Sequence, residues 1–267
     1  MSRSRRNKKK VAKQKGMLIT MFAFVIILAF GYIYWDISKN SIIRDSETMC
    51  RTDDYISKDT VLLIDATDSF SSSQSIQIEK EVKKILLNAS IDDRFSLYVI
   101  DDNTDDFKEA FYVCNPGDGS NKSELTSNKR RLKENWEKTF YDRVINSVKE
   151  LAGTHTSNTS PIIEMIKLAS LQTLYSSNAD SKEMIIISDM LEHTTKYSHY
   201  KNKPNFDEYK RLPYSIEQKP NLDGVDVKVF YLVRTKDRTR QNRGHINFWE
   251  LLVMDNGGYI SNVKVVN

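Results

Sequence analysis

The chain has 267 residues, of which 39% are hydrophobic and 28% charged. This balance is ordinary for a globular protein and excludes wholesale disorder, and the length suffices for one large α/β domain with a short appendage. The formal charge of +4 is unevenly distributed. Residues 2–15 contain eight Lys or Arg and no acid, and removing these eight from the 40 basic residues leaves 32 against 36 acidic ones. The basic excess is therefore a property of the N-terminal segment.

An apolar segment follows these basic residues. Met17–Trp35 is nineteen residues long and uncharged, and as a helix it would span roughly 28 Å, about the hydrocarbon thickness of a bilayer. Tyr32 and Tyr34 stand with Trp35 at its far end, where an interfacial belt places aromatic rings. A cleaved signal peptide is the alternative, but it would have a shorter apolar core followed by small residues. We predict an uncleaved transmembrane helix over 17–35.

The charges also predict the topology. Because positive residues stay on the cytoplasmic side, the basic segment 1–16 is predicted to be a cytoplasmic tail, and the chain after Asp36 is predicted to lie outside. A membrane thus accounts for the basic tail, and we expect no nucleic-acid partner. Residues 36–58 are polar and lack periodicity, which indicates a stem before a domain over 59–267.

Two cysteines, Cys50 and Cys114, are present. They are too few and too far apart for a cysteine zinc site. In an exported domain a pair of cysteines fits one disulfide, which would join the stem to the domain body. Two unpaired thiols are the alternative that spacing leaves open.

Residues 59–267 alternate between strand and helix patterns. Continuous apolar runs or alternating patterns predict six strands, over Thr60–Asp65, Arg94–Asp101, Glu109–Cys114, Met184–Asp189, Val225–Val233 and Tyr259–Val266. Helical periodicity predicts helices over 71–88, 124–151, 161–176 and 246–254, the first opened by a capping box of Ser71 and Gln74. Glu109–Cys114 is expected at the edge of the sheet. The pattern predicts a doubly wound, mostly parallel α/β sheet flanked by helices, with a polar insertion at 190–222.

Three polar segments follow elements of this predicted sheet. Asp65-Ala66-Thr67-Asp68-Ser69 comes directly after the first strand, a hydroxyl-rich loop ends at Ser160, and Asp189 ends the MIIISD strand. In open α/β sheets, ligands bind outside the carboxyl ends of the strands, near the point where strand order reverses. Carboxylate and hydroxyl oxygens at one such edge suit a hard divalent cation. We therefore expect the three segments to share one ion.

The three segments resemble motifs of the von Willebrand factor A family. LLIDATDSFS resembles that family's hydrophobic strand followed by D-x-S-x-S, SPIIEMI resembles its T-P-L-G-E-A-L segment, and IIISDM resembles its strand ending in T-D-G or S-D-G. The resemblance implies that Mg²⁺, or Mn²⁺ or Ca²⁺, is bound in a metal-ion-dependent adhesion site. The implied ligand residues are Asp65, Thr67, Ser69, Ser160 and Asp189. It also implies a coordination position left open for an acidic group of a protein partner.

The sequence departs from this family in a few places. Met190 and Ile163 stand where glycine is usual, and Thr154, Thr156 and Thr159 are rivals to Ser160 as the ligand of the loop. The resemblance is to bacterial members of the family. It implies a single-pass protein of a bacterial inner or plasma membrane whose C-terminal domain is periplasmic or extracellular.

The segment after the first strand also permits functions other than protein binding. D-A-T-D-S also resembles the turn of haloacid dehalogenase-type phosphatases, whose aspartate is a nucleophile, but Asp189 is followed by Met190 and not by the second acid that family has. A metal-free scaffold is a further alternative, because acidic-hydroxyl turns are common helix caps. No G-x-S-x-G or glycine-rich phosphate loop is present. We expect a binding protein and not an enzyme.

Two segments remain open to more than one interpretation. In the insertion, Tyr197, Tyr200 and Tyr209 are either partner contacts or packing residues, and His193 and His199 beside Glu192 form either a zinc site or a solvated loop. The basic run 234–243 forms either a basic surface or a solvated loop.

Overall fold

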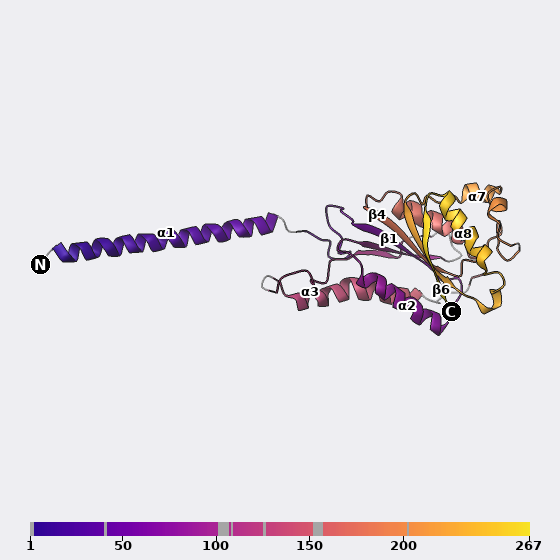
Figure 1. Cartoon of the computed structure of the whole chain (residues 1–267), viewed down its shortest axis with the longest axis horizontal. Coiled ribbons are helices and arrows are strands. Elements are labelled where there is room, and N and C mark those ends of the chain that lie inside the picture. The colour runs from indigo at the N-terminus through magenta and orange to yellow at the C-terminus, as the bar shows by residue number, and fades with distance from the viewer. Residues whose placement is uncertain are drawn as a thin grey trace. The chain divides into compact units, whose positions relative to one another are not determined.

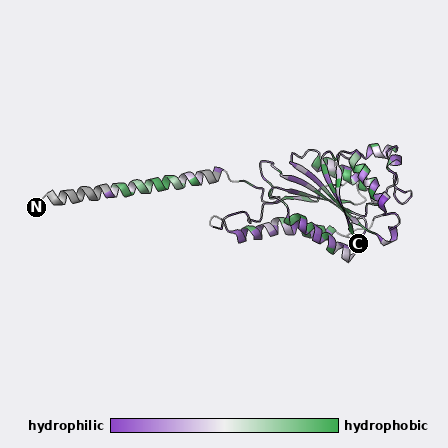
Figure 2. Cartoon of the chain, in the orientation of Figure 1, coloured by the Kyte–Doolittle hydropathy of each residue, from purple (hydrophilic) through white to green (hydrophobic). Residues whose placement is uncertain are grey.

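The structure is a computed structural model that describes residues 3–39, 42–100, 107, 109–124, 127–151, 157–201 and 203–267, with side chains left out for 3–14 and 36–38. It consists of two compact units, Met1–Ile43 and Arg44–Asn267. The first unit contains the helix α1, Arg3–Lys39. Within it, Lys15–Trp35 is long and apolar enough to cross a membrane, with 21 residues, and Figure 2 shows this apolar stretch.

The second unit is built on a six-stranded sheet in the order β3-β2-β1-β4-β5-β6. The strands are β1 Lys58–Asp65, β2 Arg94–Ile100, β3 Phe111–Cys114, β4 Ser181–Ser188, β5 Val225–Leu232 and β6 Tyr259–Val266. β3 is an edge strand and pairs antiparallel with β2, whereas all other neighbours are parallel. From β1 the chain adds strands on one side and then, from β4, on the other. Strand order therefore reverses between β1 and β4.

Helices cover both faces of the sheet (Figure 1). They are α2 Ser72–Leu87, α3 Lys129–Trp136, the π-helical turn η2 Glu137–Tyr141, α4 Asp142–Leu151, α5 Ile162–Ala169, the π-helical turn η3 Ser170–Leu174, α6 Phe206–Tyr209, α7 Pro213–Glu217, the 3₁₀ turn η4 Thr235–Asp237 and α8 Arg243–Asp255. Successive residues of a strand point to opposite faces. Thus Leu62 packs in one buried cluster with α2 and α4, while Leu63 packs in another with α5 and α8. This confirms the predicted doubly wound α/β fold.

Most predicted elements lie where the pattern placed them, with shifted ends. The capping box of Ser71 and Gln74 opens α2 as predicted, with both of its hydrogen bonds present. The helix predicted from 124 begins at Lys129, because the Asn128 side chain accepts a hydrogen bond from the third residue of the helix and caps it there. The helix predicted to run to 176 ends at Leu174. Asp101, the predicted end of the second strand, lies outside the described residues.

The segment before β1, predicted as a stem, is part of the second unit from Arg44 onward. Cys50 and Cys114 form a disulfide, and the amide N–H of Cys114 donates to the carbonyl of Thr48 over 2.8 Å. Arg44 forms an ion pair with the nearly buried carboxylate of Asp92 at 2.6 Å. Residues 44–57 therefore lie against the domain body, with Thr48 and Cys50 beside the edge strand β3.

Replacing both cysteines, Cys50→Ser with Cys114→Ser, is expected to lower the free energy of unfolding by about 3–4 kcal/mol. The bridge closes a long loop, with a sequence separation of 64, and so restricts the unfolded chain. The full-length protein in detergent micelles would be unfolded in urea with and without the bridge. An unchanged unfolding midpoint would show that the segment docks without help from the disulfide.

Candidate metal site

The first loop of the site begins where β1 ends. Asp65 is 1% exposed, and its Oδ1 accepts hydrogen bonds from the Thr67 amide at 3.0 Å and the Thr67 hydroxyl at 2.5 Å. Its Oδ2 accepts a hydrogen bond from the Ser188 hydroxyl at 2.6 Å. The carboxyl group is therefore fixed on both sides, and it orients the Thr67 hydroxyl by accepting a hydrogen bond from it.

In the second loop, residues 157–160 form backbone hydrogen bonds with the third loop and with the first loop. Ser160 and His193 exchange two backbone hydrogen bonds of 2.8 and 2.9 Å, and the amide of Ser157 donates to the carbonyl of Thr67 at 3.0 Å. As a result, the hydroxyl oxygens of Thr67 and Ser160 lie 3.3 Å apart. Of the rival ligands, Thr154 and Thr156 lie outside the described residues, while Thr159 lines the same pocket as Ser160.

The third loop follows β4. Asp189 is 4% exposed; its Oδ1 accepts from the amide of Leu191 at 2.9 Å and its Oδ2 from Nε of Arg234 at 3.2 Å. Burial, followed by the nearby charge of Asp65, raises the pKa of Asp189 to about 7. Burial also raises the pKa of Asp65, against the lowering effect of its hydrogen bonds. The two buried carboxyl groups thus interact, and the charge of Arg234 acts on both by lowering their pKa values.

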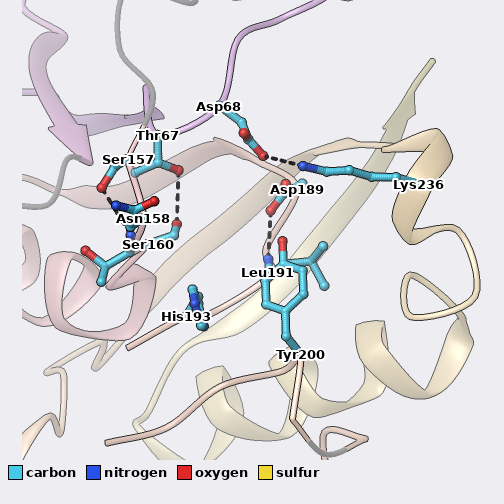
Figure 3. Close-up of a pocket in the computed structure, with 11 residues that line it drawn as sticks. Thr67, Asp68, Ser157, Asn158, Ser160, Asp189, Leu191, His193, Tyr200 and Lys236 are labelled. Carbon is cyan, nitrogen blue, oxygen red and sulfur yellow. Dashed lines mark hydrogen bonds and ion pairs between the residues drawn. The ribbon is translucent and has the colours of Figure 1, made fainter. Parts of the chain in front are cut away.

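A pocket of about 330 Å³ opens between the three loops (Figure 3). Its lining residues are Thr67, Asp68, Ser157, Asn158, Thr159, Ser160, Asp189, Leu191, His193, Tyr200 and Lys236. Asp65 lies behind Thr67, bonded to it. The structure therefore brings together four of the five predicted ligand residues. Ser69, the fifth, is exposed and does not line the pocket; its carbonyl accepts a hydrogen bond from Arg234 at 2.6 Å.

The donor set fits a hard divalent cation. Thr67, Ser160 and Asp189 bring hydroxyl and carboxylate oxygens to the pocket, the ligands that Mg²⁺ and Mn²⁺ prefer. Adjacent ligands of an octahedral Mg²⁺ at about 2.1 Å lie about 3.0 Å apart, close to the 3.3 Å between the Thr67 and Ser160 oxygens. Among the described residues, no three His, Cys, Asp or Glu side chains form a metal-binding group, so this site depends on its hydroxyls.

Both departures from the expected motifs fit the fold. Met190 adopts the left-handed backbone conformation that favours glycine, with φ of 61°. Its carbonyl accepts hydrogen bonds from His245 Nε2 and Trp249 Nε1, both at 3.0 Å, which offset the strain. Ile163 is fully buried, and its amide donates to Glu192 Oε2 at 2.9 Å.

The insertion is mostly a packing element. Tyr209 is buried, and Tyr197 packs against both Tyr209 and Phe248, with ring centroids 5.0 and 6.0 Å apart. Tyr200, by contrast, lines the pocket. His199 pairs with His245, their ring nitrogens 3.0 Å apart, and the described residues contain no group of His, Cys, Asp or Glu that would hold a zinc ion there.

Two residues of the site, Arg234 and Gln241, are not indicated by the sequence motifs. Ser188 precedes Asp189 and was visible in the motif, but its bond to Asp65 depends on strand pairing. Arg234 and Gln241 come from the basic run after β5, in which Lys236, Arg238 and Arg243 are exposed and Arg234 is partly buried. The one sequence signal for Arg234 is its position just after a buried strand, which places it at the carboxyl edge of the sheet. Its contact with Asp189 follows from the pairing of β5 with β4.

No protein-family model matches the sequence, and no curated protein is similar to it. Among solved structures, BatB from Bacteroides thetaiotaomicron is similar, with 13% identity over 78% of this chain and 90% of its own, and a TM-score of 0.40. An aerotolerance-related membrane protein from Bacteroides fragilis has 12% identity over 78% and 91%, with a TM-score of 0.38. A von Willebrand factor type A protein from Catenulispora acidiphila has 10% identity over 79% and 39%, with a TM-score of 0.40.

Stability is expected to fall as pH rises between 6.5 and 8, in part because of Glu192. Burial lowers the pKa of His199 and His245, which opposes this trend only below that window. The Glu192 carboxyl is fully buried and accepts from Ile163 N–H and the Tyr214 hydroxyl at 2.9 and 3.0 Å. Burial raises its pKa from 4.5 to about 8. In this window the folded chain keeps a proton that the unfolded chain loses, so unfolding releases it and becomes easier by at most about 1.4 kcal/mol per pH unit.

Glu192→Gln removes this titration and is expected to flatten the decline measured by urea unfolding across the window. Glu250→Gln, an exposed substitution on α8, is the control and should keep the wild-type slope. Equal slopes for wild type and Glu192→Gln would contradict the assignment.

Proposed function

We propose that this chain is a membrane-anchored domain of the von Willebrand factor A type that binds a protein partner through a divalent cation. The observation that supports this most directly is the meeting of Thr67, Ser160 and Asp189 around one pocket, with Asp65 behind them. These residues come from three loops far apart in the sequence. They meet at the carboxyl ends of β1 and β4, where open α/β sheets bind ligands.

The proposed ion is Mg²⁺ or Mn²⁺. The hydroxyls of Thr67 and Ser160 would hold it directly, and the carboxylates of Asp65 and Asp189 would supply the balancing negative charge, directly or through water. Such an ion offers an open position to a carboxylate of the partner. Lys236 and Tyr200, which line the same pocket (Figure 3), are placed to contact the residues around that carboxylate.

A binding role suits the site better than catalysis by an aspartate nucleophile. A nucleophile needs a free oxygen directed at its substrate. Asp65 is 1% exposed, and both of its oxygens already accept hydrogen bonds from Thr67 and Ser188. This burial favours a role for Asp65 in orienting and charge balance, and we propose that the chain is not an enzyme.

The anchor and the disulfide support the proposed location. A segment long and apolar enough to cross a bilayer begins at Lys15, after the basic residues that would hold it with the N-terminus in the cytoplasm. The Cys50–Cys114 disulfide suits an oxidising compartment. We propose an inner or plasma membrane location in a bacterium, with the second unit in the periplasm or outside the cell.

Full-length protein in detergent micelles is expected to bind Mn²⁺ in calorimetry, and Thr67→Val is expected to weaken this binding at least about tenfold. Valine keeps the shape of threonine and removes one oxygen ligand, a loss of at least about 1.4 kcal/mol. Thr60→Val is the matched control. Thr60 lies at the other end of β1, buried, and its hydroxyl has no hydrogen-bond partner among the described residues.

The binding role is tested by capture of partners on the immobilised full-length protein, with and without a chelator. A retained protein that is released by chelator and lost in Thr67→Val supports the proposal. Absence of Mn²⁺ binding would instead indicate a metal-free scaffold, and hydrolysis of a phosphate ester that stops in Asp65→Asn would indicate a phosphatase.

A further inference from the structure

One positive side chain already lies among the loops of the site. Arg234 follows β5, and its side chain is 11% exposed. Its Nε donates to Asp189 Oδ2 at 3.2 Å, and its two terminal nitrogens donate to the carbonyls of Ser69 at 2.6 Å and Asp68 at 3.3 Å. The guanidinium thus joins the first loop to the third.

The backbone of this arginine is fixed as well. The side-chain oxygen of Gln241 accepts a hydrogen bond from the Arg234 amide at 2.7 Å. The side-chain nitrogen of Gln241 donates to the carbonyls of Asp189 at 3.0 Å and Leu232 at 2.7 Å. Gln241 therefore fixes the Arg234 backbone beside Asp189, so that a displacement of the guanidinium requires a change in the Arg234 side chain alone.

The Arg234 guanidinium and a divalent cation would both bind the carboxylate of Asp189. Asp189 Oδ1 already accepts a hydrogen bond from the Leu191 amide. A divalent cation would therefore be bound through Oδ2, the oxygen that accepts a hydrogen bond from Arg234. Two cations sharing one nearly buried carboxylate repel strongly, since the surroundings screen charge far less than water does. Arg234 also holds the Ser69 carbonyl, and in this arrangement the Ser69 hydroxyl stays outside the pocket.

We infer that Arg234 is a tethered cation that competes with the divalent ion for Asp189. This inference rests on the proposed metal site. While the guanidinium is bonded to Asp189, it neutralises one carboxylate and holds the first loop; when an ion binds, the guanidinium leaves and the Ser69 segment is released. The displaced guanidinium remains at the rim near Lys236, which is paired with Asp68 at 3.7 Å (Figure 3). There it adds positive charge where an acidic partner would dock.

The test is a Mn²⁺ titration of the full-length protein in micelles, comparing wild type, Arg234→Gln and Arg238→Gln. Arg234→Gln removes the competing charge and is expected to bind Mn²⁺ at least about tenfold more tightly than wild type, the equivalent of one hydrogen bond to a charged group. Arg238→Gln removes the same charge from an exposed position of the same segment. It is expected to bind like wild type.

The outcomes separate this inference from the proposed function. Mn²⁺ binding by wild type that is unchanged or weaker in Arg234→Gln would overturn the competition and leave the metal site standing. Absence of binding in both proteins, at millimolar Mn²⁺, would overturn the metal site and the competition together. Binding only by Arg234→Gln would support both.

A second measurement needs no substitution. In ¹⁵N-labelled wild type, the Arg234 Nε–H is bonded to Asp189 and is expected to exchange slowly with water. Added Mg²⁺ is expected to shift this signal and speed its exchange. An Nε–H that stays protected at saturating Mg²⁺ would contradict the displacement of Arg234.

Discussion

The reversal of strand order between β1 and β4 is the constraint on which the site depends. The two strands are parallel neighbours in a register that pairs Ile64 with Ile187, so Asp65 and Ser188 come level at the carboxyl edge. Both strands are buried, with alternate residues in two separate apolar clusters. A slip of one residue would exchange these faces. The packing of the core therefore fixes where the carboxyl groups of Asp65 and Asp189 lie.

This placement buries two carboxyl groups near each other, and the surrounding groups of the site stabilise them. Two carboxyl groups, 1% and 4% exposed, are desolvated together, and the pKa of each rises. Hydroxyls from Thr67 and Ser188 stabilise Asp65, and Arg234 stabilises Asp189. Positive charge at this position offsets the desolvation of the two carboxyl groups. Arg234 supplies it in the structure, and the proposed divalent ion would supply it after Arg234 has moved away.

The fold and the two aspartates could be predicted because their signals are local. A continuous apolar run ending in an acid marks a buried parallel strand wherever it pairs, as at Ile64-Asp65 and Ser188-Asp189. The Arg234 contact could not be predicted in the same way, because it requires β5 to lie next to β4. The docking of residues 44–57 also depends on tertiary contacts, such as the ion pair of Arg44 with Asp92. Ser69 stays a prediction: its spacing fits the expected set, while in the structure its carbonyl accepts a hydrogen bond from Arg234.

The proposed metal site requires that loops distant in sequence share one ion at the edge formed by β1 and β4. Crystals of the protein soaked in Mn²⁺, with data collected for its anomalous scattering, test this directly. We expect one strong anomalous peak within direct bonding distance of the Thr67 and Ser160 hydroxyl oxygens, with Arg234 turned away from Asp189. A map with no peak there at saturating Mn²⁺, and Arg234 still bonded to Asp189, would contradict the account.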